Sequence, residues 1–227
     1  MPSKSQSQGP NRKTLVISTL VFVALFVMLF VSNQALKNGG ETNSFKNGPD
    51  TSTQPIVGDP ESKVTIVEFG DYKCPSCKAW GEQIYPKLKE AYIDNGKAKF
   101  AYVNVLFHGE ESRLGALASE AVWSQNPEAF WPFHKALFDA QPTEDHDAAW
   151  ITTEKILEIA GTIEPAINVS ELGQTLSNLS TLPEVNQDEQ MVQDFKVKQT
   201  PTIMINNVMV TDPFNYDTIV KLIEEEL

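Results

Sequence analysis

The only two cysteines of the 227-residue chain, Cys74 and Cys77, lie in the segment YKCPSCKAW, separated by a proline and a serine. A disulfide between them would close a very short loop and contribute about 2 kcal/mol, against roughly 3 kcal/mol for a 15-residue loop. A zinc site needs four ligands, usually a second pair at regular spacing, and His108, His134 and His146 form no such pair. Adjacent thiols in Cys-x-x-Cys can form and open a disulfide without backbone movement. The spacing therefore favours a redox-active pair over a structural link or a metal site.

The residues around this pair predict a strand that leads directly into a helix. The β-branched run Val64–Phe69 is typical of a buried strand. The segment Pro75–Asn95 has the apolar spacing of an amphipathic helix, with a proline suited to its first turn and a kink expected at Pro86. Cys74 then lies at the helix N-terminus, where free backbone N–H groups and the helix dipole stabilise a thiolate. The neighbouring Lys73 is expected to add a little to this stabilisation.

Further along the chain, strand-like and helical patterns follow in an order that indicates an α/β protein. A second strand is expected at Lys99–Phe107, and the late runs TIMI and VMV, joined at Asn206–Asn207, predict a hairpin. A final helix is expected to open at Asp212–Pro213. Between about residues 108 and 198 helical patterns predominate. The order resembles a thioredoxin fold interrupted by an inserted helical domain.

The segments EFGDYKCPSC and TPT resemble those of DsbA-type thiol:disulfide oxidoreductases, specifically the membrane-anchored, BdbD-like form of Gram-positive bacteria. The resemblance covers residues 55–227. It implies that Cys74 attacks and Cys77 resolves, and that Glu68 is a buried acid that helps to move the proton of the resolving thiol. It further implies that Pro201 is a cis-proline against the disulfide and that Thr200 binds the substrate backbone.

The dipeptide Pro75–Ser76 departs from the periplasmic DsbA pattern, in which a histidine commonly stands between the cysteines. A cation beside Cys74 would favour the thiolate, whereas serine offers only a hydroxyl hydrogen bond. The resemblance implies an oxidase that introduces disulfide bonds into secreted or surface proteins. Two alternatives stay open: a disulfide reductase or isomerase of the same fold, and a redox-inert, membrane-tethered module that binds unfolded chains like a chaperone.

The resemblance also implies partners. Reduced or unfolded secreted proteins would be the substrates, and a quinone-linked membrane thiol oxidase of the DsbB or VKOR type would reoxidise the cysteine pair. No cofactor is implied beyond that pair. The net charge of −12 argues against nucleic acid as a partner.

The N-terminal residues predict a membrane anchor. Residues 1–14 form a short basic tail, and residues 15–31 are almost uninterruptedly apolar, at the short end of the length of a transmembrane helix. Because the positive charges precede this run, residues 1–14 are expected in the cytoplasm and the large domain on the extracytoplasmic face of the cell membrane. An uncleaved anchor is favoured over a signal peptide. Residues 32–54 are polar and expected to form a flexible linker to the domain at 55–227.

Other groups in the inserted helices could take part in chemistry, but each also has a structural interpretation. The aromatic residues of the segment PEAFWPFHKALFDA could line a substrate groove, although core packing is favoured; they are Phe130, Trp131, Phe133 and Phe138. The acidic segment Thr143–Asp147, with Glu110 and Glu111, could bind calcium, although a solvated loop is favoured. His108 and His134 are expected to be satisfied or exposed rather than catalytic.

Overall fold

The computed structural model describes Val23, residues 25–28, residues 43–145 and residues 148–227, and it divides into one unit up to residue 41 and a second from residue 42 onward. In the first unit, Val23 and residues 25–28 are helical. Within the described ranges, no helix is long and apolar enough to cross a membrane. The expected tail (1–14), most of the expected anchor (15–31) and the start of the expected linker fall outside these ranges, so the anchor stays a prediction.

The second unit is built on a six-stranded sheet with the order β1-β6-β5-β3-β4-β2. Its strands are β1 (Asn43–Ser44), β2 (Ile56–Gly58), β3 (Val64–Gly70), β4 (Ala98–Asn104), β5 (Thr202–Ile205) and β6 (Val208–Met209). Strands β3 and β4 are parallel, and the other pairs are antiparallel. The predicted central strands and the hairpin are confirmed, although β4 ends at Asn104 rather than at Phe107. Strands β1 and β2 are too short to leave a pattern in the sequence.

The expectation of a flexible linker as far as residue 54 is wrong for residues 43–54. Strand β1 pairs with β6, and the Phe45 side chain packs on the sheet with Phe195. At the end of the segment, the Gln54 amide donates a hydrogen bond to the buried Asp188 carboxylate at 2.9 Å. Long-range pairing of this kind fastens a polar segment that has no apolar periodicity of its own.

Helices cover both faces of the sheet. On one face lie α2 (Pro75–Gln83), α3 (Tyr85–Leu88), the π-helical turn η1 (Lys89–Ile93) and α9 (Tyr216–Glu226), and on the other lies the C-terminal end of α8 (Leu182–Asp194). The predicted long helix after the cysteines is broken at Ile84, just before Pro86 in the first turn of α3. Helix α9 starts later than Asp212–Pro213, because the Asn215 side chain caps it by accepting from the Thr218 N–H.

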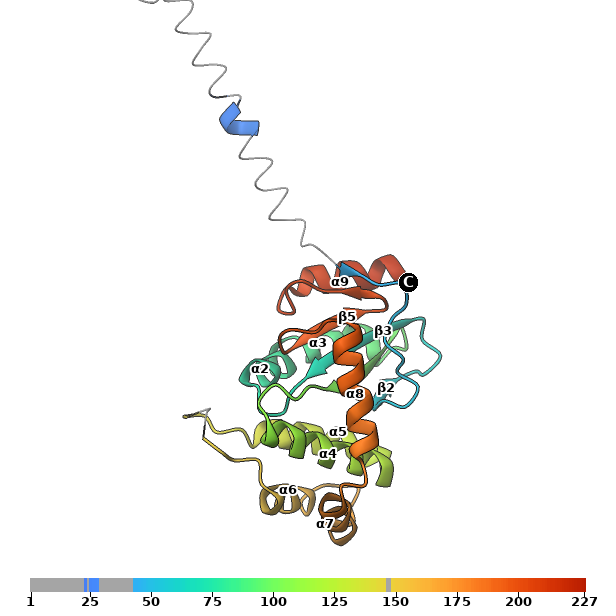
Figure 1. Ribbon diagram of the computed structural model, residues 1–227. Coiled ribbons are helices and arrows are strands. Elements are labelled where there is room, and N and C mark those ends of the chain that lie inside the picture. Colours follow the sequence, from blue (N-terminus) through green and yellow to red (C-terminus); the bar gives the residue numbers. More distant parts are fainter. Residues whose placement is uncertain (1–22, 24, 29–42, 146–147) are drawn as a thin grey trace, which may run out of the picture. The chain divides into compact units, whose positions relative to one another are not determined.

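The predicted helical insertion is confirmed. It consists of α4 (Glu110–Gln125), α5 (Pro127–Asp139), α6 (Thr153–Ala160), α7 (Val169–Asn178) and α8. Figure 1 shows α4 to α7 gathered together beside the sheet, with α8 running back from them to it. Both cysteines pack into the apolar core of this insertion. The Cys-x-x-Cys segment therefore lies where the sheet and the inserted helices meet.

Candidate active site

Cys74 is held at the start of α2 by the turn that leaves β3. It is the N-cap residue of the helix, and its backbone N–H donates to the Asp71 carbonyl at 2.9 Å. Pro75 follows in the first turn, as predicted. Both cysteines are free thiols, and Cys74 Sγ lies 3.4 Å from the carbonyl oxygen of Thr200.

This environment lowers the pKa of Cys74 to about 5. The largest cause is a hydrogen bond from the Cys77 side chain, which outweighs the opposing effect of burial; the Thr200 side chain and the backbone N–H groups of Cys77 and Ser76 add to it. The backbone N–H groups of the helix N-terminus contribute in the predicted direction, but they are not the largest cause. Ser76 contributes through its backbone N–H, and the thiolate is stabilised without a histidine in the dipeptide.

Cys77 has the opposite character. Its side chain is almost completely buried, and burial, followed by its hydrogen bond to Cys74 and the charge of Glu68, raises its pKa well above the usual range. The backbone N–H of Asp71 donates to Cys77 Sγ at 3.4 Å. The pair thus combines a stabilised thiolate at Cys74 with an inner thiol at Cys77 that is held in its protonated form, and opposed pKa shifts of this kind assign different roles to two adjacent groups.

Glu68 lies on β3, two residues after Ile66. Because residues two apart on a strand share a face, Glu68 is on the face of the sheet that α2 covers. Its side chain is 3% exposed, and Oε1 finds no hydrogen-bond partner among the described residues. Burial, and secondly the charge of Cys74, raise the pKa of this carboxyl well above its usual range. Glu68 is therefore a buried acid beside the cysteine pair, as the resemblance implies, and its role in proton transfer stays a prediction.

Thr200 and Pro201 precede β5 and lie against Cys74, although they are more than a hundred residues away in sequence. The peptide bond between them is cis, as the resemblance implies. Pro201 is buried and Thr200 half-buried. The predicted site residues of both chain segments thus meet at one place, while the substrate-binding role of Thr200 stays a prediction.

Comparison with known proteins agrees with this geometry. A family model described as thioredoxin matches residues 50–225. Disulfide bond formation protein D of Bacillus subtilis is 41% identical over 179 residues, which are 79% of each chain. A probable disulfide bond formation protein D of Bacillus anthracis is 32% identical over 94% of each chain. The chain belongs to the thioredoxin family, in its BdbD-like group. The crystal structure of oxidised BdbD from Bacillus subtilis superposes with a TM-score of 0.76 at 38% identity, covering 81% of this chain and 98% of that one.

Membership in the BdbD-like group makes the chain a thiol:disulfide oxidoreductase whose redox-active group is its cysteine pair.

The site also contains residues that sequence reasoning missed, and the most important of them is Asp71. Its buried carboxylate accepts hydrogen bonds from four groups: Lys73 N at 2.9 Å, Phe107 N at 3.1 Å, His108 Nδ1 at 2.7 Å and Ser112 Oγ at 2.9 Å. Asp71 therefore joins the cysteine turn to the beginning of the inserted helices. The hydrogen bond from Lys73 N to the Asp71 side chain, two residues earlier, is a local turn motif that aspartate often forms. The long-range partners of Asp71 leave no pattern in the sequence.

We expect Asp71→Ala to lower the free energy of unfolding of this BdbD-like domain by about 3 kcal/mol, because buried donors lose their acceptor. Urea-induced unfolding of the reduced protein at pH 7 measures this change. The matched control is Glu189→Ala, which removes an exposed carboxylate and should change the value by less than about 0.5 kcal/mol. A loss below about 1 kcal/mol for Asp71→Ala would show that the carboxylate does not hold the cysteine turn.

Lys73 does not act on Cys74 as expected. Its ammonium group, 6% exposed, forms an ion pair with Glu111 at 2.8 Å and also donates to the Ala148 carbonyl. Glu111 in turn accepts from the backbone N–H groups of Trp150 and Ile151. Lys73 therefore secures the loop before α6 rather than the thiolate.

The calcium alternative gains no support from this arrangement. Glu111, one of the acids considered for it, is committed to Lys73 and to the backbone N–H groups. His146 and Asp147 fall outside the described residues. In the part of the chain that the structure describes, no three His, Cys, Asp or Glu side chains gather as a metal site.

The two described histidines have structural partners, as expected. His134 contacts the Tyr72 hydroxyl through Nδ1 at 2.9 Å, and burial lowers its pKa to about 3, so it is neutral. His108 pairs with Asp71. Of the aromatic residues on α5, Phe130, Phe133 and Phe138 belong to the core, as favoured. Phe138 and the partly buried Trp131 also line a cavity.

Proposed function

We propose that this chain is a membrane-tethered dithiol oxidase that introduces disulfide bonds into secreted or surface proteins. The observation that carries the proposal is the pKa of about 5 at Cys74, next to a Cys77 whose pKa is raised. A thiolate that is stable at neutral pH is a good leaving group and favours the reduced form of the enzyme. An enzyme with a stabilised reduced form gives its disulfide to other proteins.

The reaction has two exchange steps. In the oxidised enzyme, a substrate thiolate attacks Cys74 Sγ; the Cys74–Cys77 bond breaks, and its electron pair goes to Cys77, which takes up a proton. A second substrate thiolate then attacks the substrate sulfur of the mixed disulfide, and Cys74 leaves as a thiolate. The substrate loses two electrons, which remain in the reduced cysteine pair.

A hollow of about 320 Å³ beside Cys74 fits the first of these steps. Ser76, Thr200, Pro201 and Phe214 are among the residues that line it. Phe214 is 38% exposed. An extended substrate segment in this hollow would bring its thiolate to Cys74, in keeping with the substrate-binding role proposed for Thr200.

The tether, the location and the recycling partner belong to the proposal as well. The apolar run at residues 15–31, preceded by basic residues, supports a single anchor with residues 55–227 on the extracytoplasmic face. A membrane thiol oxidase of the DsbB or VKOR type, linked to quinones, would return the two electrons to the membrane. Both features would keep the enzyme where secreted chains emerge.

The redox potential decides between the oxidase and a reductase or isomerase of the same fold. We expect residues 38–227, equilibrated in glutathione buffers and assayed for free thiols by alkylation, to have a potential near the roughly −120 mV of strong oxidants. The physical reason is that the stabilised Cys74 thiolate favours the reduced form of the enzyme and so raises its redox potential. A value near about −270 mV, as in thioredoxin, would instead identify a reductant.

A further inference from the structure

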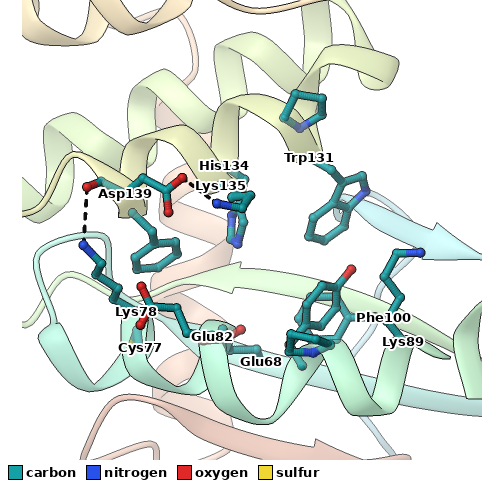
Figure 2. A pocket seen from close by; sticks show the side chains of 15 residues that line it. Glu68, Cys77, Lys78, Glu82, Lys89, Phe100, Trp131, His134, Lys135 and Asp139 are labelled. Carbon is teal, nitrogen blue, oxygen red and sulfur yellow. Dashed lines mark hydrogen bonds and ion pairs between the residues drawn. The ribbon is translucent and has the colours of Figure 1, made fainter. Parts of the chain in front are cut away.

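A cavity of about 570 Å³ lies between helices α2 and α3 on one side and α5 on the other. Figure 2 shows Trp131 and His134 of α5 facing the α2 side across it. Glu68 and Cys77 line its buried end, and exposed residues such as Gly81 line its mouth. An engineered cavity of about 150 Å³ already holds benzene, and small-molecule sites commonly measure roughly 300–1,000 Å³. The cavity therefore has room for a molecule of two or more rings.

The walls of the cavity are mainly aromatic. The centroid of the Phe100 ring lies 4.8 Å from that of Tyr85 and 5.5 Å from that of Trp131, and Phe138 adds a further ring to the lining. Aromatic rings attract one another in tilted and edge-to-face arrangements at such separations. The walls thus favour a ligand that contributes an aromatic ring over one that contributes only an alkyl chain.

The buried end of the cavity contains a polar atom that needs a partner. Glu68 Oε1 has no hydrogen-bond partner among the described residues, and the side chain is 3% exposed. A buried oxygen without a donor costs free energy. His134, which also lines the cavity, already contacts the Tyr72 hydroxyl through Nδ1. A ligand that carries a hydroxyl group could donate it to Glu68 Oε1 and remove this cost.

The charged side chains of the cavity favour a ligand without charge. Away from the buried end, the lining contains three lysines and two exposed acids; they are Lys78, Lys89, Lys135, Glu82 and Asp139. All three lysines already have oxygen partners, so they disfavour a cation without offering a free partner to an anion. At the buried end, burial raises the pKa of Glu68 and lowers that of His134 to about 3, which favours the uncharged form of both groups. A neutral molecule suits both ends of the cavity.

We propose that the cavity between α2 and α5 is a binding site for a small, neutral hydroxy-aromatic molecule. Its hydroxyl group donates a hydrogen bond to Glu68 Oε1, and its rings pack against Phe100 and Trp131. A free molecule fits this space better than a side chain of a protein partner, because a single phenol ring would leave most of the 570 Å³ empty. Since Cys77 lines the same cavity, the bound molecule lies against the inner cysteine of the redox pair.

This site is distinct from the surface proposed for protein substrates. The hollow beside Cys74 and the cavity between α2 and α5 share no lining residue among those that the structure describes. The ligand therefore reaches the redox pair from the side of Cys77, and a protein substrate reaches it from the side of Cys74. Ligand binding goes beyond the proposed oxidase function and can be measured without turnover.

Two probes that differ by a single donor test the hydrogen bond to Glu68. Umbelliferone is a two-ring phenol, and herniarin is its methyl ether, which has the same rings and no hydroxyl group. Equilibrium dialysis against the full-length, reduced protein at pH 6, where the phenol is neutral, is read by the fluorescence of each probe. We expect a Kd on the order of 0.1 mM for umbelliferone. Herniarin should bind about tenfold more weakly, because it leaves the Glu68 oxygen without a donor.

Three variants locate the bound probes. Glu68→Leu should abolish the difference between the two probes, because the acceptor is gone. Gly81 is exposed and lines the cavity, and a Cβ built there meets nothing within 4 Å among the described residues. Gly81→Leu should therefore narrow the mouth without a clash and weaken both probes about tenfold, the loss expected when about two CH₂ equivalents of contact are no longer buried.

The matched control is Gln83→Leu, which adds the same side chain to an exposed position of α2 that is not among the lining residues. It should bind both probes as the parent does. Binding to the apolar run at residues 15–31 would be the same in every variant, so it cannot produce these differences. Thermal unfolding verifies that each variant is folded.

Three results would overturn the proposal. The first is no binding of umbelliferone up to the limit of its solubility, and the second is equal binding of the two probes to the parent. The third is unchanged binding to a folded Gly81→Leu variant, which would place the probes elsewhere. Failure of the proposed function would look different, because the protein would bind umbelliferone as expected and yet not oxidise a reduced test protein.

Discussion

Cys74→Ser is expected to abolish oxidation of a reduced test protein, because the Cys74–Cys77 disulfide that the substrate thiolate attacks can no longer form. Cys74 is the residue whose Sγ lies at Thr200 and whose pKa falls to about 5, whereas the pKa of Cys77 is raised well above its usual range. The loss should reach the rate without enzyme. The measurement is the regain of activity by a reduced, unfolded, disulfide-dependent enzyme, followed over time.

Cys77→Ser is the matched control for this result. The variant keeps the low-pKa thiol and should still be captured by activated substrates, yet the mixed disulfides should persist because the inner thiol that would displace the substrate is missing. They would appear as higher-mass bands on a non-reducing gel. Two results would contradict the assignment of the two roles. One is retained oxidase activity in Cys74→Ser, and the other is the appearance of mixed disulfides on Cys77 in Cys74→Ser but none on Cys74 in Cys77→Ser.

The second large effect concerns the ionisation of Cys74 in the reduced enzyme. Its pKa in the folded state is about 5, below the ordinary value of 9.0, so ionisation stabilises the folded state. This stabilisation is complete above about pH 9 and is lost as the pH falls through 5. We therefore expect the stability difference between the reduced enzyme and Cys74→Ser to grow by roughly 1 kcal/mol per pH unit from pH 6 to 8. The comparison cancels most of the opposite effect of Glu68, whose raised pKa destabilises the folded state of both proteins as the pH rises.

The pKa itself can be read from the pH dependence of iodoacetamide alkylation, with a midpoint expected near 5. In Cys77→Ala the largest stabilising hydrogen bond is gone, and the midpoint should rise by about 1 to 2 pH units, since a hydrogen bond to a charged group contributes roughly 1.5–3 kcal/mol. An unchanged midpoint would mean that the helix N-terminus and Thr200 hold the thiolate alone. The difference in the free energy of unfolding between the reduced enzyme and Cys74→Ser is measured at each pH by urea-induced unfolding.

The sequence predicts the parts of this site that depend on local patterns. Apolar β-branched residues predict β3. A proline followed by apolar residues spaced three to four positions apart predicts the helix at whose N-terminus Cys74 lies. Because a helix N-terminus acts on whatever residue stands there, the direction of the pKa shift at Cys74 could be predicted without coordinates.

The other features arise from contacts between distant segments and have no local signature. Asp71 reaches His108 and Ser112, Lys73 reaches Glu111, and the segment before β2 reaches Asp188 through Gln54. The cavity, too, requires α5 to lie opposite α2. Its aromatic residues could be seen in the sequence, but which of them fill the core and which face open space depends on the packing.

The two separate openings also suggest how such an enzyme could be inhibited. A small apolar molecule lodged between α2 and α5 would contact Phe100 and Trp131 without touching the hollow next to Pro201. Because the cavity and the hollow share no lining residue among those that the structure describes, high concentrations of a protein substrate could not displace such a molecule. Noncompetitive inhibition is therefore expected of a ligand that binds in this cavity.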